Sequence, residues 1–90
     1  MKNTIRSIIK KIPRNVIFDS HTIIFRLRQD FSDVYLNNYN KKGTKLYHGE
    51  LGQIIAEFQK DPTDKIELCG KSWSKNVLDK YSTCTCWKKP

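Results

Sequence analysis

The spacing of apolar residues changes once along this chain, and that change limits the folds open to it. As far as Phe58, apolar residues recur every three or four positions, which is the spacing of amphipathic helices. From Lys65 onward they alternate with polar residues, and threonine, cysteine and aromatic residues become frequent, as in strands. A chain of 90 residues has room for one modest core. We therefore predict a single α+β domain over residues 1–90.

The positions of capping residues and prolines set the predicted elements. They are a helix over 4–12, a short strand over 15–18, helices over 20–30 and 45–59, and a β-hairpin over 65–88 with an irregular tip near 74–80. Pro13 and Pro62 end the first and third helices, and Asp19 or Ser20 supplies the N-cap of the second. Residues 31–44 are expected to form one short helical turn and then a loop, because the asparagines there disfavour a stable helix.

This order of elements resembles the winged helix-turn-helix superfamily, in which a short strand follows the first of three helices and a C-terminal hairpin forms the wing. The resemblance spans about residues 4–88 and rests on element order and patterning. It implies that the helix Lys45–Gln59 enters the DNA major groove and that the wing, roughly Lys65–Lys88, contacts the backbone. The connection 31–44 is longer than the usual turn of three or four residues. In an alternative, Asp33–Lys41 forms the second half of the motif.

The third predicted helix contains Gly49 and Gly52, although each glycine costs a helix roughly 0.5–1 kcal/mol relative to alanine. Both lie on the side opposite the apolar stripe, with His48 and Gln53, and His48 is expected to be exposed. One interpretation is that DNA approaches this bare side closely, with Lys45 on a phosphate and Gln53 on an adenine. The alternatives are that the glycines allow tight packing against the second helix or the preceding loop, or that a protein docks there.

The net charge of +8 is concentrated at the two ends of the sequence. Residues 1–14 carry five basic residues and no acid, and residues 65–90 carry six lysines against two acids. Such a distribution attracts polyanions, although lysines on the wing can also protect an exposed strand edge from aggregation. The predicted nucleic-acid-binding residues are Arg26, Lys42, Lys45, His48, Gly49, Gly52, Gln53, Lys71, Lys75 and Lys80.

The three cysteines are predicted to be reduced thiols of the hairpin. In an alternative, the register brings Cys69 opposite Cys84 and Cys86, so that three thiols and a histidine bind zinc. The cysteine pair spacing of zinc knuckles is absent, so we predict no metal and no cofactor. Trp73 and Trp87 are expected to face each other across the hairpin.

Several function classes are disfavoured by the sequence. No apolar run approaches the ~20 residues of a membrane span, and no export signal is recognisable, so a cytoplasmic protein is expected. No arrangement of nucleophile, base and orienting group indicates an enzyme. We predict a binder of double-stranded DNA with a regulatory or targeting role. One alternative is an inhibitor or adaptor of phage or host-defence type that binds an acidic protein through Tyr35, Tyr39 and Trp73. Another is a binder of single-stranded nucleic acid.

Overall fold

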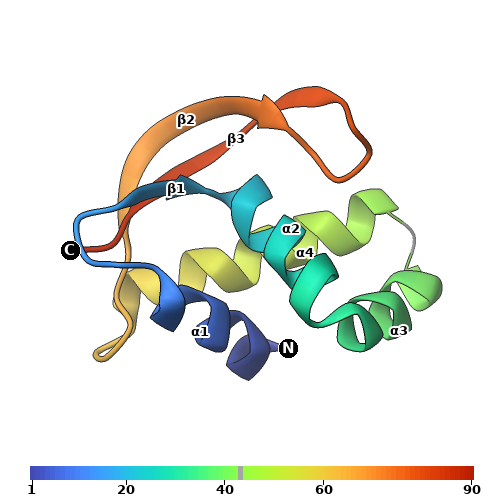
Figure 1. The fold of residues 1–90 in the computed structure, drawn as a ribbon, viewed down its shortest axis with the longest axis horizontal. Coiled ribbons are helices and arrows are strands. Elements are labelled where there is room, and N and C mark those ends of the chain that lie inside the picture. Colours follow the sequence, from blue (N-terminus) through green and yellow to red (C-terminus); the bar gives the residue numbers. More distant parts are fainter. Residues whose placement is uncertain (43) are drawn as a thin grey trace.

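The computed structural model describes the backbone of residues 1–42 and 44–90 and the side chains of residues 1–39 and 47–90. Helices and strands follow one another in the order α1 (Lys2–Lys11), β1 (Ile17–Asp19), α2 (Ser20–Asp30), α3 (Ser32–Lys42), α4 (Thr44–Glu57), the 3₁₀ turn η1 (Phe58–Lys60), β2 (Glu67–Lys75) and β3 (Tyr81–Lys88). Helices form one layer and the curved hairpin covers it (Figure 1). The predicted α+β class, the short strand after the first helix and the C-terminal hairpin are confirmed.

The prediction of three main helices and a loop over 31–44 was wrong, because Ser32–Lys42 forms the helix α3. Its stability comes from packing: the Tyr35 ring is buried and contacts the rings of Tyr39 and Tyr47 at centroid distances of 5.9 and 5.3 Å. The side chain of Asn38 donates a hydrogen bond to the Val34 carbonyl within the helix. Tertiary contacts therefore outweigh the weak helix propensity of the asparagines.

The core lies between the helices and the sheet. The predicted apolar faces of the first, second and last helices are buried in it. Its buried apolar residues are Ile5, Ile8, Ile9, Phe18, Ile23, Ile24, Leu27, Tyr35, Tyr47, Leu51, Ile55, Phe58, Ile66 and Trp87. Within the described part of the chain, no helix is both long and apolar enough to cross a membrane.

The sheet is antiparallel, and its strand order is β1-β3-β2, so the last strand of the sequence is the middle strand of the sheet. Trp87 pairs with Phe18 on one side and Leu68 on the other, and its indole N–H donates to the Ser20 hydroxyl at 3.0 Å. The expected contact between Trp73 and Trp87 is therefore wrong. Trp73 pairs with Thr83, because a bulge between Leu68 and Gly70 and the length of the turn set a different register.

Side chains cap the N-terminus of α2 and the C-terminus of α1. Asp19 caps α2 as predicted, because its carboxylate accepts the Thr22 N–H at 2.8 Å. At the other end of the sequence, the Lys89 ammonium donates to the carbonyls of Ile9, Lys10 and Ile12. The Ile9 carbonyl also accepts the backbone N–H of Ile12, and a cation is favoured at a helix C-terminus. The segment after β3 is thereby held against the first helix.

A charge cluster joins α1 to the connection between η1 and β2. The Arg6 guanidinium donates to both oxygens of Asp61, at 3.0 and 2.7 Å, and to Asp64 at 2.8 Å. Both aspartates are buried, and Asp61 also accepts the backbone N–H groups of Thr63 and Asp64. The bonds from Arg6, followed by those from the backbone, hold the pKa of Asp61 well below its ordinary value.

The lowered pKa of Asp61 predicts a loss of stability in acid. Above about pH 5 the carboxylate is ionised in both the folded and the unfolded chain, and its stabilising contribution is complete. As the pH falls toward the lower, folded-state pKa, the unfolded chain takes up the proton first, so the free energy of unfolding decreases. We expect urea unfolding curves to show this decrease between about pH 5 and pH 2. Asp61→Asn should flatten that dependence, and an unchanged slope in the variant would contradict the assignment.

Candidate nucleic-acid interface

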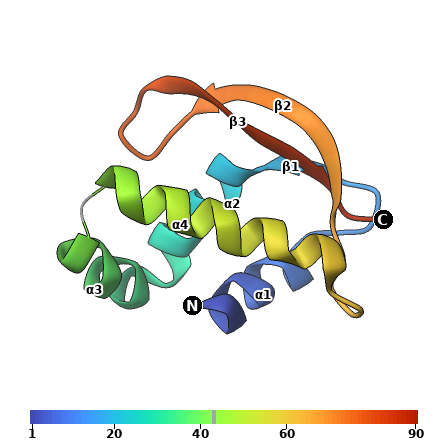
Figure 2. The same ribbon diagram turned by 180° about the vertical axis from the view of Figure 1, so that it is seen from behind.

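The outward side of α4 is open at both glycines. Figure 2 shows α4 across the front of the molecule, with the hairpin along one side and α1 and α3 along the other. Gly49 is exposed and Gly52 is half-buried. Among the described residues, a Cβ atom built at either position meets no atom within 4 Å beyond the adjoining backbone of its own helix. The described residues therefore give no support to the alternative in which these glycines allow tight packing within the chain. Gln53 is exposed, as predicted.

The described part of α4 lacks the basic residues that the prediction of DNA binding requires. The side chains of Lys42 and Lys45, which were predicted to bind DNA, lie outside the described residues. From Tyr47 to Glu57 the sequence of α4 has two glutamates and no basic residue. The carboxylate of Glu57 lies 3.4 Å from the Lys2 ammonium, which offsets one of these negative charges. In the described residues, Lys2 and Lys60 border α4, in a pocket that also contains Gln53.

The hairpin presents its predicted lysines to solvent. Lys71 and Lys75 are exposed on β2, and Lys80 is exposed in the turn before β3. The two strand lysines share a face with Trp73, because alternate residues of a strand point to the same side. Trp73 is 67% exposed and stacks on Tyr81 at a centroid distance of 6.2 Å. The Lys75 ammonium lies 3.0 Å from the Asp79 carboxylate, which reduces its net charge toward a partner.

Arg26 belongs to a different side of the molecule. It is exposed on α2, and its guanidinium lies 4.0 Å from the Asp30 carboxylate. Arg26 and Lys75 border the same small pocket beside the start of α2, whereas Gly52 borders a separate cleft on the α4 side. The predicted site residues are thus divided between two sides of the hairpin. Among the hairpin lysines, Lys75 thus lies on the side of Arg26 and not in the cleft that Gly52 borders.

A cleft of about 320 Å³ separates the hairpin from the start of α2 and from α4. Residues that line it include His21, His48, Gly52, Val77, Ser82 and Cys84. The expected exposure of His48 was wrong: the ring is half-buried, and Nε2 lies 2.7 Å from the Tyr35 hydroxyl. Burial, together with the charge of nearby His21, lowers the pKa of His48. His48 is therefore neutral at neutral pH and unsuited to neutralise a phosphate.

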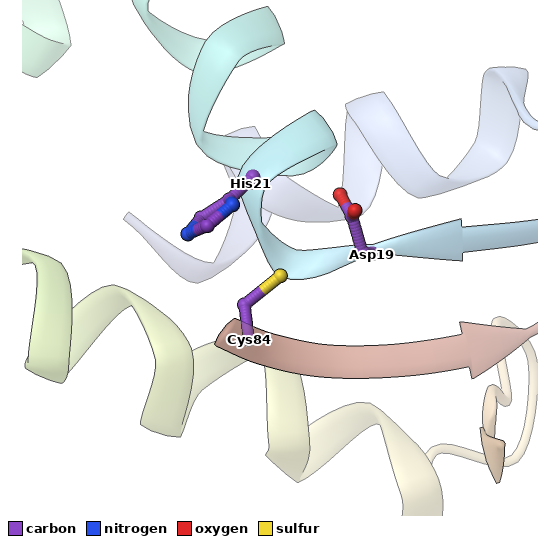
Figure 3. A group of neighbouring side chains, drawn as sticks. All are labelled: Asp19, His21 and Cys84. Atoms are coloured by element: carbon purple, nitrogen blue, oxygen red, sulfur yellow. The ribbon is translucent and has the colours of Figure 1, made fainter. Parts of the chain in front are cut away.

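A cluster of possible metal ligands lies at the junction of β1, α2 and β3, where sequence reasoning expected none. The ligand atoms of Asp19, His21 and Cys84 all lie within 4.8 Å of one another (Figure 3). The sequence alternative had combined Cys84 with Cys69 and Cys86. What it missed is that β1 pairs with β3, which brings Asp19 and the first turn of α2 beside the cysteines. Only the strand order reveals this, because these residues are far apart in sequence.

Comparison of the chain with protein-family models, with curated proteins and with solved structures finds no match.

Proposed function

We propose that this protein is a winged-helix-like domain that binds double-stranded DNA, with α4 toward the major groove and the hairpin on the phosphate backbone. The observation that carries the proposal is the free space beside α4 at Gly49 and Gly52, in a domain whose hairpin presents exposed lysines. A helix without side chains at these positions allows a DNA strand to approach its backbone closely. Gln53, one turn after Gly49, offers an amide that can form two hydrogen bonds with adenine.

The element order adds support. A short strand after the first helix joins the C-terminal hairpin in a sheet of order β1-β3-β2, and the last helix before the hairpin has an uncovered side. This proposal treats α3 as an extra helix between α2 and the groove-facing helix. The alternative assignment, in which Asp33–Lys41 enters the groove, gains no support from packing, because Tyr35 of that helix is buried against Tyr47.

Salt dependence of binding tests the role of the hairpin. Fluorescence anisotropy with a labelled duplex, between about 50 and 200 mM salt, should show affinity falling steeply, with a log–log slope of about −0.9 per neutralised phosphate. Replacement of Lys71 and Lys75 by glutamine should weaken binding at low salt and make the slope shallower by up to about 2. Lys10→Gln with Lys11→Gln removes the same charge from exposed positions at the end of α1 and should change the slope much less.

Two results would overturn this proposal. One is the absence of duplex binding at low salt, and the other is an equal effect of the hairpin and α1 double variants. A single-stranded oligonucleotide provides a further comparison. Tighter binding to it, with quenching of Trp73 fluorescence, would favour the single-strand alternative. Trp87 cannot contribute to stacking on a base, because it is buried.

A second candidate function, binding of an acidic protein, is favoured by one observation. The stacked pair Trp73 and Tyr81 is exposed beside Lys71 and Lys75, which gives the aromatic and basic composition common at interface hot spots. Tyr35 was predicted to take part in such a contact, but it is buried and unable to reach a partner. For this function, Trp73→Ala should abolish binding of the acidic partner, whereas changes at Gly49 and Gly52 should leave it intact.

A further inference from the structure

The geometry points to a zinc site formed by Asp19, His21 and Cys84, with Cys86 as the fourth ligand. This site is separate from the proposed DNA-binding surface and uses residues from three elements: β1, the first turn of α2, and β3. These side chains supply the oxygen, nitrogen and sulfur donors that Zn²⁺ binds in proteins. The metal would tie the middle strand of the sheet to the start of α2.

Three of the donors are already close together. Their ligand atoms lie within 4.8 Å of one another, and Figure 3 shows the Cys84 sulfur directed toward the space between the His21 ring and the Asp19 carboxylate. In a tetrahedral zinc site, bond lengths of about 2.0–2.3 Å place neighbouring ligand atoms roughly 3.3–3.8 Å apart. The largest of these separations thus exceeds the tetrahedral spacing by no more than about 1.5 Å. Cys84 and His21 also line the cleft, so an ion can reach them from solvent.

The hydrogen bonds of His21 allow the tautomer that a metal needs. Nδ1 lies 2.7 Å from the Ser74 hydroxyl, and Nε2 lies 3.3 Å from the Ser82 hydroxyl. The oxygen of Ser82 also accepts a bond from the Asn76 side chain, so the chain offers an acceptor for an Nε2 proton. With the proton on Nε2, Nδ1 accepts the Ser74 hydroxyl, and a metal would take the place of that hydroxyl. A bond from the second ring nitrogen is the usual outer support of a zinc-bound histidine.

Asp19 can bind a metal and still cap α2. One carboxylate oxygen accepts the backbone N–H and the hydroxyl of Thr22, each at 2.8 Å. The other oxygen accepts the Ser72 hydroxyl at 2.9 Å, and this hydroxyl can rotate away. Partial burial raises the pKa of Asp19, but the bonds from Thr22, Ser74 and Ser72 outweigh it and leave the pKa below its ordinary value. The carboxylate is therefore ionised at neutral pH, as a ligand must be.

Cys86 is the candidate for the fourth ligand, although its sulfur lies outside the group of ligand atoms within 4.8 Å of one another. It lies two residues beyond Cys84 on β3, hence on the same face of the strand, and it pairs directly with Asp19 of β1. Burial raises the pKa of the Cys86 thiol, with contributions from neighbouring Cys69, Asp19 and Cys84. Without metal, the protonated thiol is therefore favoured. A divalent cation stabilises the thiolate instead, so zinc binding would release the protons of Cys84 and Cys86 to the solvent.

Cobalt(II) is a suitable probe, because it occupies zinc sites and reports thiolate ligands by light absorption. Metal-free, reduced protein titrated with Co²⁺ should develop a thiolate-to-cobalt charge-transfer band together with the visible bands of a tetrahedral ion, and Zn²⁺ should remove both. Cys84→Ala and His21→Gln should each weaken Co²⁺ binding by more than the ~10–100-fold typical of outer-shell changes. Ser82→Ala, which removes only the support of His21, should weaken binding by about 10-fold.

Cys69 is an exposed cysteine hydrogen-bonded to Cys86 and is not among the proposed ligands, so its variant distinguishes the proposed ligand set from one that includes Cys69. Cys69→Ala should retain the charge-transfer band and the affinity of the wild-type protein. The proposal is overturned if wild-type protein gives no such band, or if the Cys69 and Cys84 variants bind Co²⁺ equally. Circular dichroism of each metal-free variant establishes that it is folded, so that a lost band reports a lost ligand. The titration needs no DNA, and its outcome is independent of the proposed function.

Discussion

Replacement of Arg6 by methionine is expected to lower the melting temperature by about 10 °C or more. Arg6 forms ion pairs with Asp61 and Asp64, whose side chains are 7% and 8% exposed. Methionine keeps an unbranched apolar side chain but removes the guanidinium, which lies over the Phe58 ring, and leaves two buried carboxylates without their cation. Removing one partner from such a cluster lowers the stability of the fold far more than replacing the whole cluster by apolar residues, because the remaining charge stays buried without a partner. Thermal unfolding followed by circular dichroism measures the effect.

Lys2→Met is the matched control for this prediction. Lys2 also lies over Phe58 and pairs with an acid, Glu57, but both of these charged side chains are about half exposed. Solvent screens such a pair, and its loss should change the melting temperature by only a few degrees. Adding Asp61→Asn and Asp64→Asn to the Arg6 variant should recover part of the lost stability. Equal effects of the Lys2 and Arg6 substitutions would show that the cluster does not stabilise the fold in this way.

Substitution of both Gly49 and Gly52 by alanine should change stability and DNA binding in opposite directions. Alanine favours the helix by roughly 0.5–1 kcal/mol at each position, and the added methyl groups meet no neighbouring atom. Chemical denaturation should therefore show a more stable protein. If a DNA strand occupies the space beside these residues, the same methyl groups collide with it, and the affinity for duplex should fall by at least about 10-fold. Anisotropy at fixed salt measures that loss.

A third substitution separates added bulk from added rigidity. Ala56→Gly is added to the variant that carries Gly49→Ala and Gly52→Ala. It returns one glycine to α4 and should cancel about half of the stability that the two alanines add. Binding should remain weak, because the methyl groups at positions 49 and 52 are still present. Recovery of binding in the triple variant would mean that helix flexibility, and not open space, is what DNA requires. A stabilised double variant that binds DNA as well as wild type would exclude this side of α4 as the contact surface.

Sequence patterning predicted the elements whose residues face one core along a regular repeat. The isoleucines of α1 and the stripe from Tyr47 to Phe58 on α4 belong to this class, as does the N-cap Asp19. Helix α3 was not predicted, because its stability depends on the packing of Tyr35 against Tyr47 of α4. No local pattern contains that information.

The candidate sites were less predictable than the fold, because they depend on the register and order of strands. The bulge beside Cys69 decides that Trp73 pairs with Thr83, and thereby exposes the indole on the outer face of the hairpin. Likewise, the neighbours of Cys84 follow from the pairing of β1 with β3. A slip of one residue would send every side chain of a strand to the opposite face, so apolar patterning alone could not fix these contacts.

The position of β3 in the middle of the sheet has a consequence for synthesis on the ribosome. Translation produces all four helices, β1 and β2 before the strand that joins those two strands together. Until Trp87 emerges, Phe18 lacks its paired neighbour and the hydroxyl of Ser20 lacks its indole donor. Before β3 is made, the edges of β1 and β2 are unpaired and able to pair with another molecule. The sheet forms only after β3 has been synthesised.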